Sequence, residues 1–128
     1  MAQRPSPRLR GEALETVALN HLCRQGLRPV CRNFQCRLGE IDLIMQDGAT
    51  LVFVEVRYRR SARYGSPVET VDWRKQRKLI RTAQVYLCMR YGTHSAPCRF
   101  DILGIAPGGS AEEYRFDWCR NAFGLPHS

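Results

Sequence analysis

Apolar residues follow two different periods along this chain, and the changes of period mark the predicted elements. Between Gly11 and Gln25 they recur every three or four positions, which indicates an amphipathic helix. Leu27–Cys36, Glu40–Met45 and Leu51–Tyr58 are short and β-prone, and the first of them is irregular at Pro29. The first half of the chain therefore predicts one helix followed by three strands.

The second half predicts one more helix and two more strands. Ser66-Pro67-Val68-Glu69 has the form of a capping box with proline at the first helical position, and the main body of the helix is expected from about Asp72 to Arg90. Cys98–Ile105 and Tyr114–Trp118 are predicted strands on either side of a Pro-Gly-Gly turn. This order predicts an α/β or α+β layer architecture with one mixed β-sheet. We expect a flexible basic tail at residues 1–10 and a single domain at residues 11–128.

Composition narrows the class of protein. The 128 residues suit one domain, and a net charge of +8 with a pI of about 9.6 favours a polyanionic partner such as nucleic acid. No apolar run approaches the roughly 20 residues of a membrane span, and the first residues lack the apolar segment of a secretory signal. The six cysteines form no C-x-x-C pair, so most are expected to be small buried residues in a reducing compartment. These features predict a cytoplasmic protein without a membrane partner.

Acidic residues lie on two strands that a short turn joins. Alternation puts Glu40 and Asp42 on one face of the first strand and Glu55 and Arg57 on one face of the second. The Asp-Gly pair between the strands is a strong turn signal. The hairpin therefore brings at least two carboxylates together on one face.

Two registers of this hairpin are open. If Met45 pairs with Val52, Asp42 faces Glu55; if the loop has two residues, Glu40 faces Glu55 and Asp42 lies diagonally. Opposed like charges destabilise a sheet unless a cation or a shared proton compensates them. Mg²⁺, which is often held by one or two carboxylates, fits this requirement. The alternative is a set of ordinary ion pairs with nearby arginines at the strand ends.

Several ordered segments then resemble one family. They are Gly39-Glu-Ile-Asp-Leu-Ile, Val52-Phe-Val-Glu-Val-Arg-Tyr-Arg-Arg-Ser, Arg63-Tyr-Gly, Lys75-Gln and Cys98-Arg-Phe-Asp. Over about residues 11–123 the chain is similar to the YraN family of small bacterial proteins. This resemblance implies a nuclease-like domain with the restriction-endonuclease-like fold, closest to archaeal Holliday-junction resolvases. It therefore implies an α/β fold with a central mixed β-sheet flanked by helices.

The resemblance also implies a site. Asp42 and Glu55 match the two acidic residues of the superfamily pattern, Asp followed by Glu-x-Lys, which binds Mg²⁺ (or Mn²⁺). Glu15 matches a helical glutamate of resolvase-like members, and the backbone carbonyl of Val56 would be a further ligand. Arg57 stands where the superfamily has lysine. Arginine stays protonated, so it can stabilise a phosphate but cannot act as a base.

The chain has only two lysines, Lys75 and Lys78, both on the second predicted helix. Because some superfamily members supply the basic residue from a neighbouring element, either lysine is a candidate substitute for the missing one.

Basic residues concentrate directly after the Glu55 strand. Half of the chain's 20 lysines and arginines lie between Arg57 and Arg90, against two acidic residues. Such a cluster suits phosphate contacts, and the neighbouring aromatics suit base stacking. The candidate nucleic-acid-binding residues are Arg59, Arg60, Arg63, Arg74, Lys75, Arg77, Lys78 and Arg81. The alternative is a solvated helix face.

Three functions follow from these patterns. The first is a Mg²⁺-dependent endodeoxyribonuclease acting on branched or otherwise structured DNA, with Asp42, Glu55, Arg57 and Glu15 in its catalytic site. A resolvase makes two cuts, so a homodimer is expected of it. The second is a nucleic-acid-binding module without cleavage, and the third is an interaction protein for an acidic partner. Asp101 shares a strand face with Arg99, which predicts a structural ion pair rather than a catalytic acid.

Overall fold

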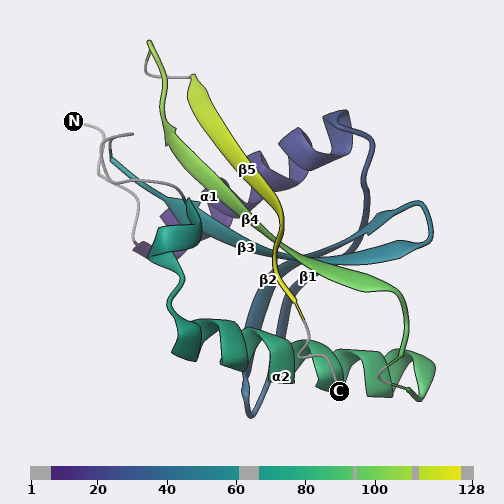
Figure 1. Cartoon of the computed structure of the whole chain (residues 1–128). Coiled ribbons are helices and arrows are strands. Elements are labelled where there is room, and N and C mark those ends of the chain that lie inside the picture. The colour runs from purple at the N-terminus through teal and green to yellow at the C-terminus, as the bar shows by residue number, and fades with distance from the viewer. Residues whose placement is uncertain (1–6, 61–66, 94, 111–112, 125–128) are drawn as a thin grey trace.

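The computed structural model describes residues 7–60, 67–93, 95–110 and 113–124. Within these ranges two helices, five strands and one short 3₁₀ helix follow in the predicted order (Figure 1). In chain order they are α1 (Pro7–Arg24), β1 (Arg28–Cys36), β2 (Gly39–Asp47), β3 (Thr50–Tyr58), η1 (Pro67–Thr70), α2 (Trp73–Tyr91), β4 (Cys98–Pro107) and β5 (Tyr114–Phe123).

The five strands form one mixed sheet in the order β1-β2-β3-β4-β5. The β3–β4 pair is parallel, because α2 connects the two strands as a crossover, and the other pairs are antiparallel. Alternate residues of β3 enter two cores: Phe53 packs with α2 on one face, and Val52 packs with α1 on the other. The predicted α/β architecture is therefore confirmed, and it is consistent with a restriction-endonuclease-like fold (Figure 1).

α2, Trp73–Tyr91, confirms the helix body expected from about Asp72 to Arg90, whereas α1 begins earlier than predicted. α1 begins at Pro7, inside the range expected to be a tail, because proline suits the first turn of a helix. The capping box fails as a start of α2, since residues 67–70 form a separate 3₁₀ helix and Ser66 lies outside the described residues. Asp72 caps α2 instead, and its Oδ1 accepts a hydrogen bond from the Lys75 backbone N–H at 2.8 Å.

The β2–β3 hairpin has a two-residue loop, Gly48-Ala49, closed by the pair Asp47–Thr50. Met45 pairs with Val52, so the first of the two predicted registers is observed. The expectation that a two-residue loop would place Glu40 opposite Glu55 was wrong. From the pair Asp47–Thr50 the register runs without a shift to Leu43–Val54. Extending it by one residue on each strand places Asp42 opposite Glu55.

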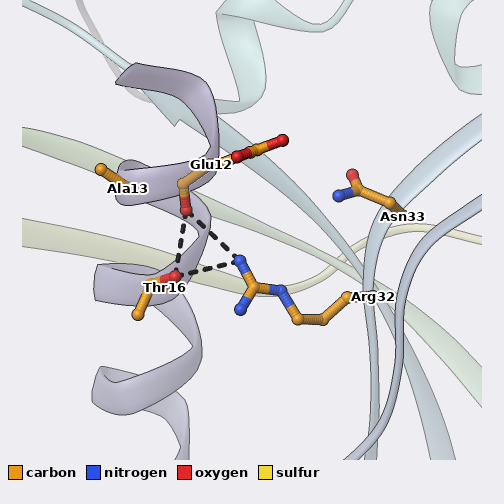
Figure 2. A pocket seen from close by; sticks show the side chains of 5 residues that line it. All are labelled: Glu12, Ala13, Thr16, Arg32 and Asn33. Carbon is orange, nitrogen blue, oxygen red and sulfur yellow. Dashed lines mark hydrogen bonds between the residues drawn. The ribbon is translucent and has the colours of Figure 1, made fainter. Parts of the chain in front are cut away.

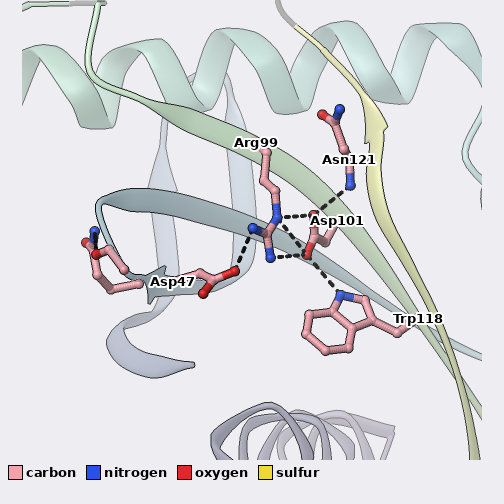
Figure 3. A network of polar contacts seen from close by, with 7 residues as sticks. Asp47, Arg99, Asp101, Trp118 and Asn121 are labelled. Carbon is pink, nitrogen blue, oxygen red and sulfur yellow. Dashed lines mark hydrogen bonds and ion pairs between the residues drawn. The ribbon is translucent and has the colours of Figure 1, made fainter. Parts of the chain in front are cut away.

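A buried polar network joins β4, β5 and the β2–β3 turn (Figure 3). The Asp101 carboxylate has no exposed side-chain area and accepts hydrogen bonds from Arg99 Nε at 3.1 Å and from Trp118 Nε1 at 2.9 Å. The Asn121 backbone N–H donates to it at 2.9 Å, and Arg99 Nη1 reaches Asp47 Oδ2 at 2.7 Å. The predicted Arg99–Asp101 ion pair is thus confirmed as a structural one.

The cysteines differ from the expectation that most are buried. Cys23 and Cys88 are exposed, and the other four are half-buried; all six are free thiols. Cys31, Cys98 and Cys119 pack at the margin of the core beneath α2 rather than at its centre. Neither helix, over its described residues, has the length and apolar character needed to cross a bilayer.

Candidate active site

Asp42 on β2 and Glu55 on β3 lie next to each other where the hairpin ladder ends. The pair farthest from the turn is Leu43–Val54, so Asp42 and Glu55 are the next residues on each strand. The Asp42 side chain then replaces a backbone partner, since its Oδ2 accepts a hydrogen bond from the Val56 N–H at 2.8 Å. The Glu55 side chain is only 8% exposed. The sheet therefore holds two carboxylates side by side in a largely dehydrated position.

Burial raises the pKa of both carboxyl groups. For Glu55 desolvation is the largest cause and the neighbouring Asp42 charge the next, and together they raise its pKa to about 7. Desolvation likewise raises the pKa of Asp42, against the lowering effect of the Val56 hydrogen bond. Full ionisation of both carboxyl groups is therefore unfavourable in this position. A bound divalent cation would supply the positive charge that stabilises the ionised pair.

Two cationic side chains approach Glu55 without neutralising it. Arg57 Nε lies 3.5 Å from Glu55 Oε1, and Lys75 Nζ lies 3.8 Å from the same oxygen. Arg57 Nε is buried and has no hydrogen-bond partner among the described residues. Both distances leave the Glu55 oxygens open to a further, closer ligand.

The structure distinguishes the two lysines. Lys75 is half-buried and turned toward Glu55 from the first turns of α2, whereas Lys78 is exposed. Of the two lysines, Lys75 is therefore the one that contacts Glu55.

Glu15 reaches the same region from α1. Its Oε2 accepts a hydrogen bond from Asn33 Nδ2 at 2.9 Å and lies 3.9 Å from Arg32 Nη2. Burial is the largest cause of its raised pKa, and the charges of Asp42 and Glu40 add to it. Glu15 thus lies within electrostatic range of Asp42, the β2 member of the carboxylate pair.

Sequence reasoning missed Asn33, which positions Glu15. Asn33 has a left-handed φ of 51°, a conformation that asparagine tolerates better than most residues. An asparagine within a β-prone segment was the available signal, because asparagine is depleted in strands.

A shallow pocket opens beside Glu15 between α1 and β1 (Figure 2). It has a volume of about 490 Å³ and is lined by Glu12, Ala13, Thr16, Arg32 and Asn33. The Arg32 guanidinium donates to Thr16 Oγ1 at 3.0 Å and to the Glu12 carbonyl at 3.3 Å. These hydrogen bonds hold the positively charged Arg32 side chain at the wall of the pocket.

The donor set suits a hard divalent cation. Among the described residues no group of three or more His, Cys, Asp or Glu side chains is gathered as for a fully enclosed metal, so the site offers a carboxylate pair. Mg²⁺ is commonly held by such a pair together with waters and substrate phosphate. Asp42 and Glu55 would be the protein ligands, and the role of the Val56 carbonyl stays a prediction.

The basic residues of α2 lie mainly on its exposed face. Arg74, Lys78 and Arg81 share that face as predicted, and Arg77 joins them. Arg60 is exposed and Arg59 half-buried after β3, while Arg63 lies outside the described residues. The described members form a cationic surface on the helix whose first turns reach the carboxylate pair.

Known proteins resemble this chain over most of its length. A family model described as "Uncharacterised protein family UPF0102" matches residues 14–105. A UPF0102 protein of Stutzerimonas stutzeri (strain A1501) is 50% identical over 113 residues, covering 88% of this chain and 92% of the relative. A UPF0102 protein of Pseudomonas aeruginosa (strain LESB58) is 42% identical over 123 residues, covering 96% and 98%. The names of this family and of these relatives assign no biochemical activity.

Proposed function

The chain belongs to the family UPF0102, the YraN family that its motifs resemble, and from that premise we propose a divalent-metal-dependent endonuclease acting on branched or otherwise structured DNA. The family name assigns no reaction, so the proposal is supported by the site. We place the enzyme in the cytoplasm, where its substrate would be chromosomal DNA. A homodimer would provide the two active sites that two cuts require.

One observation carries the proposal. Two neighbouring strands hold Asp42 and Glu55 together in a desolvated position, and the pKa of Glu55 rises to about 7. Desolvation and mutual repulsion of two carboxylates lower the stability of a fold. Such a pair beside a cationic helix face is therefore typical of a functional site. The same basic surface supplies the electrostatic attraction that a DNA backbone needs.

Each residue then has a chemical role. A bound Mg²⁺ or Mn²⁺ would lower the pKa of a water and neutralise charge on the scissile phosphate. Asp42 and Glu55 would supply the carboxylate oxygens that hold the ion. Lys75 and Arg57 stabilise negative charge on the phosphate from the α2 side and the β3 side. Glu15, held by Asn33, orients a water or a second ion next to the pair.

A cleavage assay tests the proposal. Purified protein in low salt with Mg²⁺ or Mn²⁺ is incubated with Holliday-junction, flap, single-stranded and plain duplex DNA. We expect cleavage of a branched substrate that EDTA abolishes and that Asp42→Ala and Glu55→Ala both lose. Asp117→Asn, an exposed acid on β5, serves as the matched control and should cleave normally.

Binding without cleavage in any metal would instead support a non-catalytic nucleic-acid-binding module. Arg57 favours that second candidate, because a permanently protonated side chain occupies the position of the superfamily lysine. Absence of both binding and cleavage would leave an acidic protein partner as the explanation of the basic surface.

Lys75→Gln is expected to reduce the cleavage rate constant by about 100-fold, the scale for losing one electrostatic group at a transition state. The substitution also removes a positive charge that lowers the pKa of Glu55, so the acidic limb of the pH–rate profile should move to higher pH. Lys78→Gln, three residues on and exposed, is the matched control. Equal losses in the two variants would show that Lys75 contributes only bulk charge.

A further inference from the structure

An exposed tryptophan stands at the first residue of α2. Trp73 is 65% exposed, although a tryptophan side chain is one of the largest apolar groups that a core can use. Leu79, Ala83, Tyr86 and Leu87 of the same helix are buried against the sheet, whereas Met89 and Tyr91 near its other end are exposed. Folding therefore gains little from Trp73, and its ring is available for a contact outside the chain.

One face of the indole ring already carries a cation. The Arg77 guanidinium lies 4.6 Å from the ring centroid, one helical turn farther along α2. This contact restricts the motion of the ring, and the exposed part of the ring is available to a second flat partner. The arrangement is that of a preformed stacking surface with a positive charge attached.

The surroundings select an anionic partner. Arg74, Arg77 and Lys78 are exposed within five residues of Trp73, and the nearest acid along the helix, Asp72, is engaged as the N-cap. An apolar protein segment would gain nothing from so many cations. A nucleotide satisfies both features, because its base is flat and its phosphate is negative.

The ring stands at the same end of α2 as the lysine that contacts the carboxylate pair. Lys75 Nζ lies 3.8 Å from Glu55 Oε1. Trp73 precedes Lys75 by two residues, a rise of about 3 Å along the helix axis and a rotation of about 200° around it, so the two side chains leave the helix on nearly opposite sides. A strand whose phosphate sits at Glu55 would therefore pass around the start of α2 to reach the indole ring.

We propose that Trp73 is a stacking platform for an unpaired nucleobase of a DNA strand entering the site. This inference rests on the proposed function and specifies its substrate class, namely DNA with a single-stranded segment beside the cut. A fully paired duplex hides the faces of its bases and cannot use the platform.

The test measures binding alone, in EDTA, by fluorescence anisotropy. A labelled oligo(dT) strand and a duplex of equal length are titrated with wild type, Trp73→Ala, Trp73→Phe and Met89→Ala. Met89 is 72% exposed on the same helix and is the matched control. Trp73→Ala should weaken oligo(dT) binding by about 5- to 150-fold, the contribution of one base stacked on an aromatic side chain.

The other arms follow from the same mechanism. Trp73→Phe should keep most of the affinity, and Met89→Ala should keep all of it. Duplex binding should be unchanged in every variant, and the salt dependence of oligo(dT) binding should be unaltered because no charge is removed. Tryptophan fluorescence should be quenched by oligo(dT) in wild type but not in Trp73→Ala, which retains only Trp118.

Unchanged oligo(dT) affinity in Trp73→Ala, or an equal loss on duplex, would overturn the inference. Its failure is separable from that of the proposed function. A chain that cuts no DNA but loses oligo(dT) binding with Trp73 would refute only the nuclease. A chain that cuts DNA while Trp73→Ala binds oligo(dT) normally would refute only the platform.

Discussion

Glu55→Gln is expected to raise the free energy of unfolding at about pH 8 by about 3 kcal/mol and to abolish cleavage in the same protein. The stability gain arises because wild-type Glu55 is ionised there while desolvated and close to Asp42. Glutamine keeps the shape of the side chain and removes the charge. Cleavage should fall by about 100-fold or more, since the variant loses a carboxylate ligand.

The pH dependence has a defined direction. The folded pKa of Glu55 is about 7, above its ordinary value of 4.5, so between these values the folded state binds more protons than the unfolded state. Wild-type stability therefore falls as pH rises through this window and levels off above it. The raised pKa of Asp42 acts in the same direction. Glu55→Gln should flatten the fall and match wild type near the lower end of the window.

Urea unfolding in EDTA, followed by circular dichroism across this pH range, measures the effect. Asp117→Asn controls for removal of an exposed negative charge and should change stability little. If Glu55→Gln were less stable than wild type above pH 7, Arg57 and Lys75 would already neutralise the carboxylate, and the case for a cation site would weaken.

Asp101→Asn should have the opposite effect and lower the free energy of unfolding by about 3–5 kcal/mol, the cost of removing one partner of a buried ion pair. The Asp101 carboxylate is fully buried and receives donors from Arg99, Trp118 and the Asn121 backbone (Figure 3). An amide turns one acceptor oxygen into a donor, so at least one of these groups loses its partner. Arg99, only 18% exposed, would keep Asp47 alone.

The matched control for this variant is Asp47→Asn. Asp47 bonds the same guanidinium at 2.7 Å but is 38% exposed, so its loss should cost no more than about 1 kcal/mol. Chemical denaturation at neutral pH compares the two variants. Similar small losses in both would mean that the network is replaceable, whereas cleavage per folded molecule should be unaffected in either case because neither residue contacts the carboxylate pair.

The two acids contrast in their partners. Glu55 and Asp101 are both buried, yet Asp101 has close hydrogen-bond donors, whereas the cations that approach Glu55 among the described residues, Arg57 and Lys75, lie 3.5 and 3.8 Å away. Burial of a charge is tolerable when it is matched and costly when it is not. Asp101 is therefore a structural acid. Glu55 is a buried carboxylate whose charge would be stabilised by binding a cation.

The sequence by itself determined the order of the elements, the mixed sheet and the meeting of at least two carboxylates on the β2–β3 hairpin. These are consequences of short-range rules, since the period of apolar residues sets each element and a tight turn pairs the strands that it joins. The Arg99–Asp101 pair was predictable for the same reason, because two residues on one strand share a face. The sequence left open whether Asp42 or Glu40 faces Glu55, and the structure decides for Asp42.

Only the tertiary structure decided which lysine contacts Glu55, how Glu15 is held, and which buried acid has close hydrogen-bond donors. Lys75 and Lys78 look equivalent in sequence, but α2 packs so that Lys75 faces Glu55 and Lys78 faces solvent. Asn33 meets Glu15, and Arg99 meets Asp47, across 18 and 52 positions of the chain. Such contacts depend on how whole elements pack, and local periodicity carries no information about that packing.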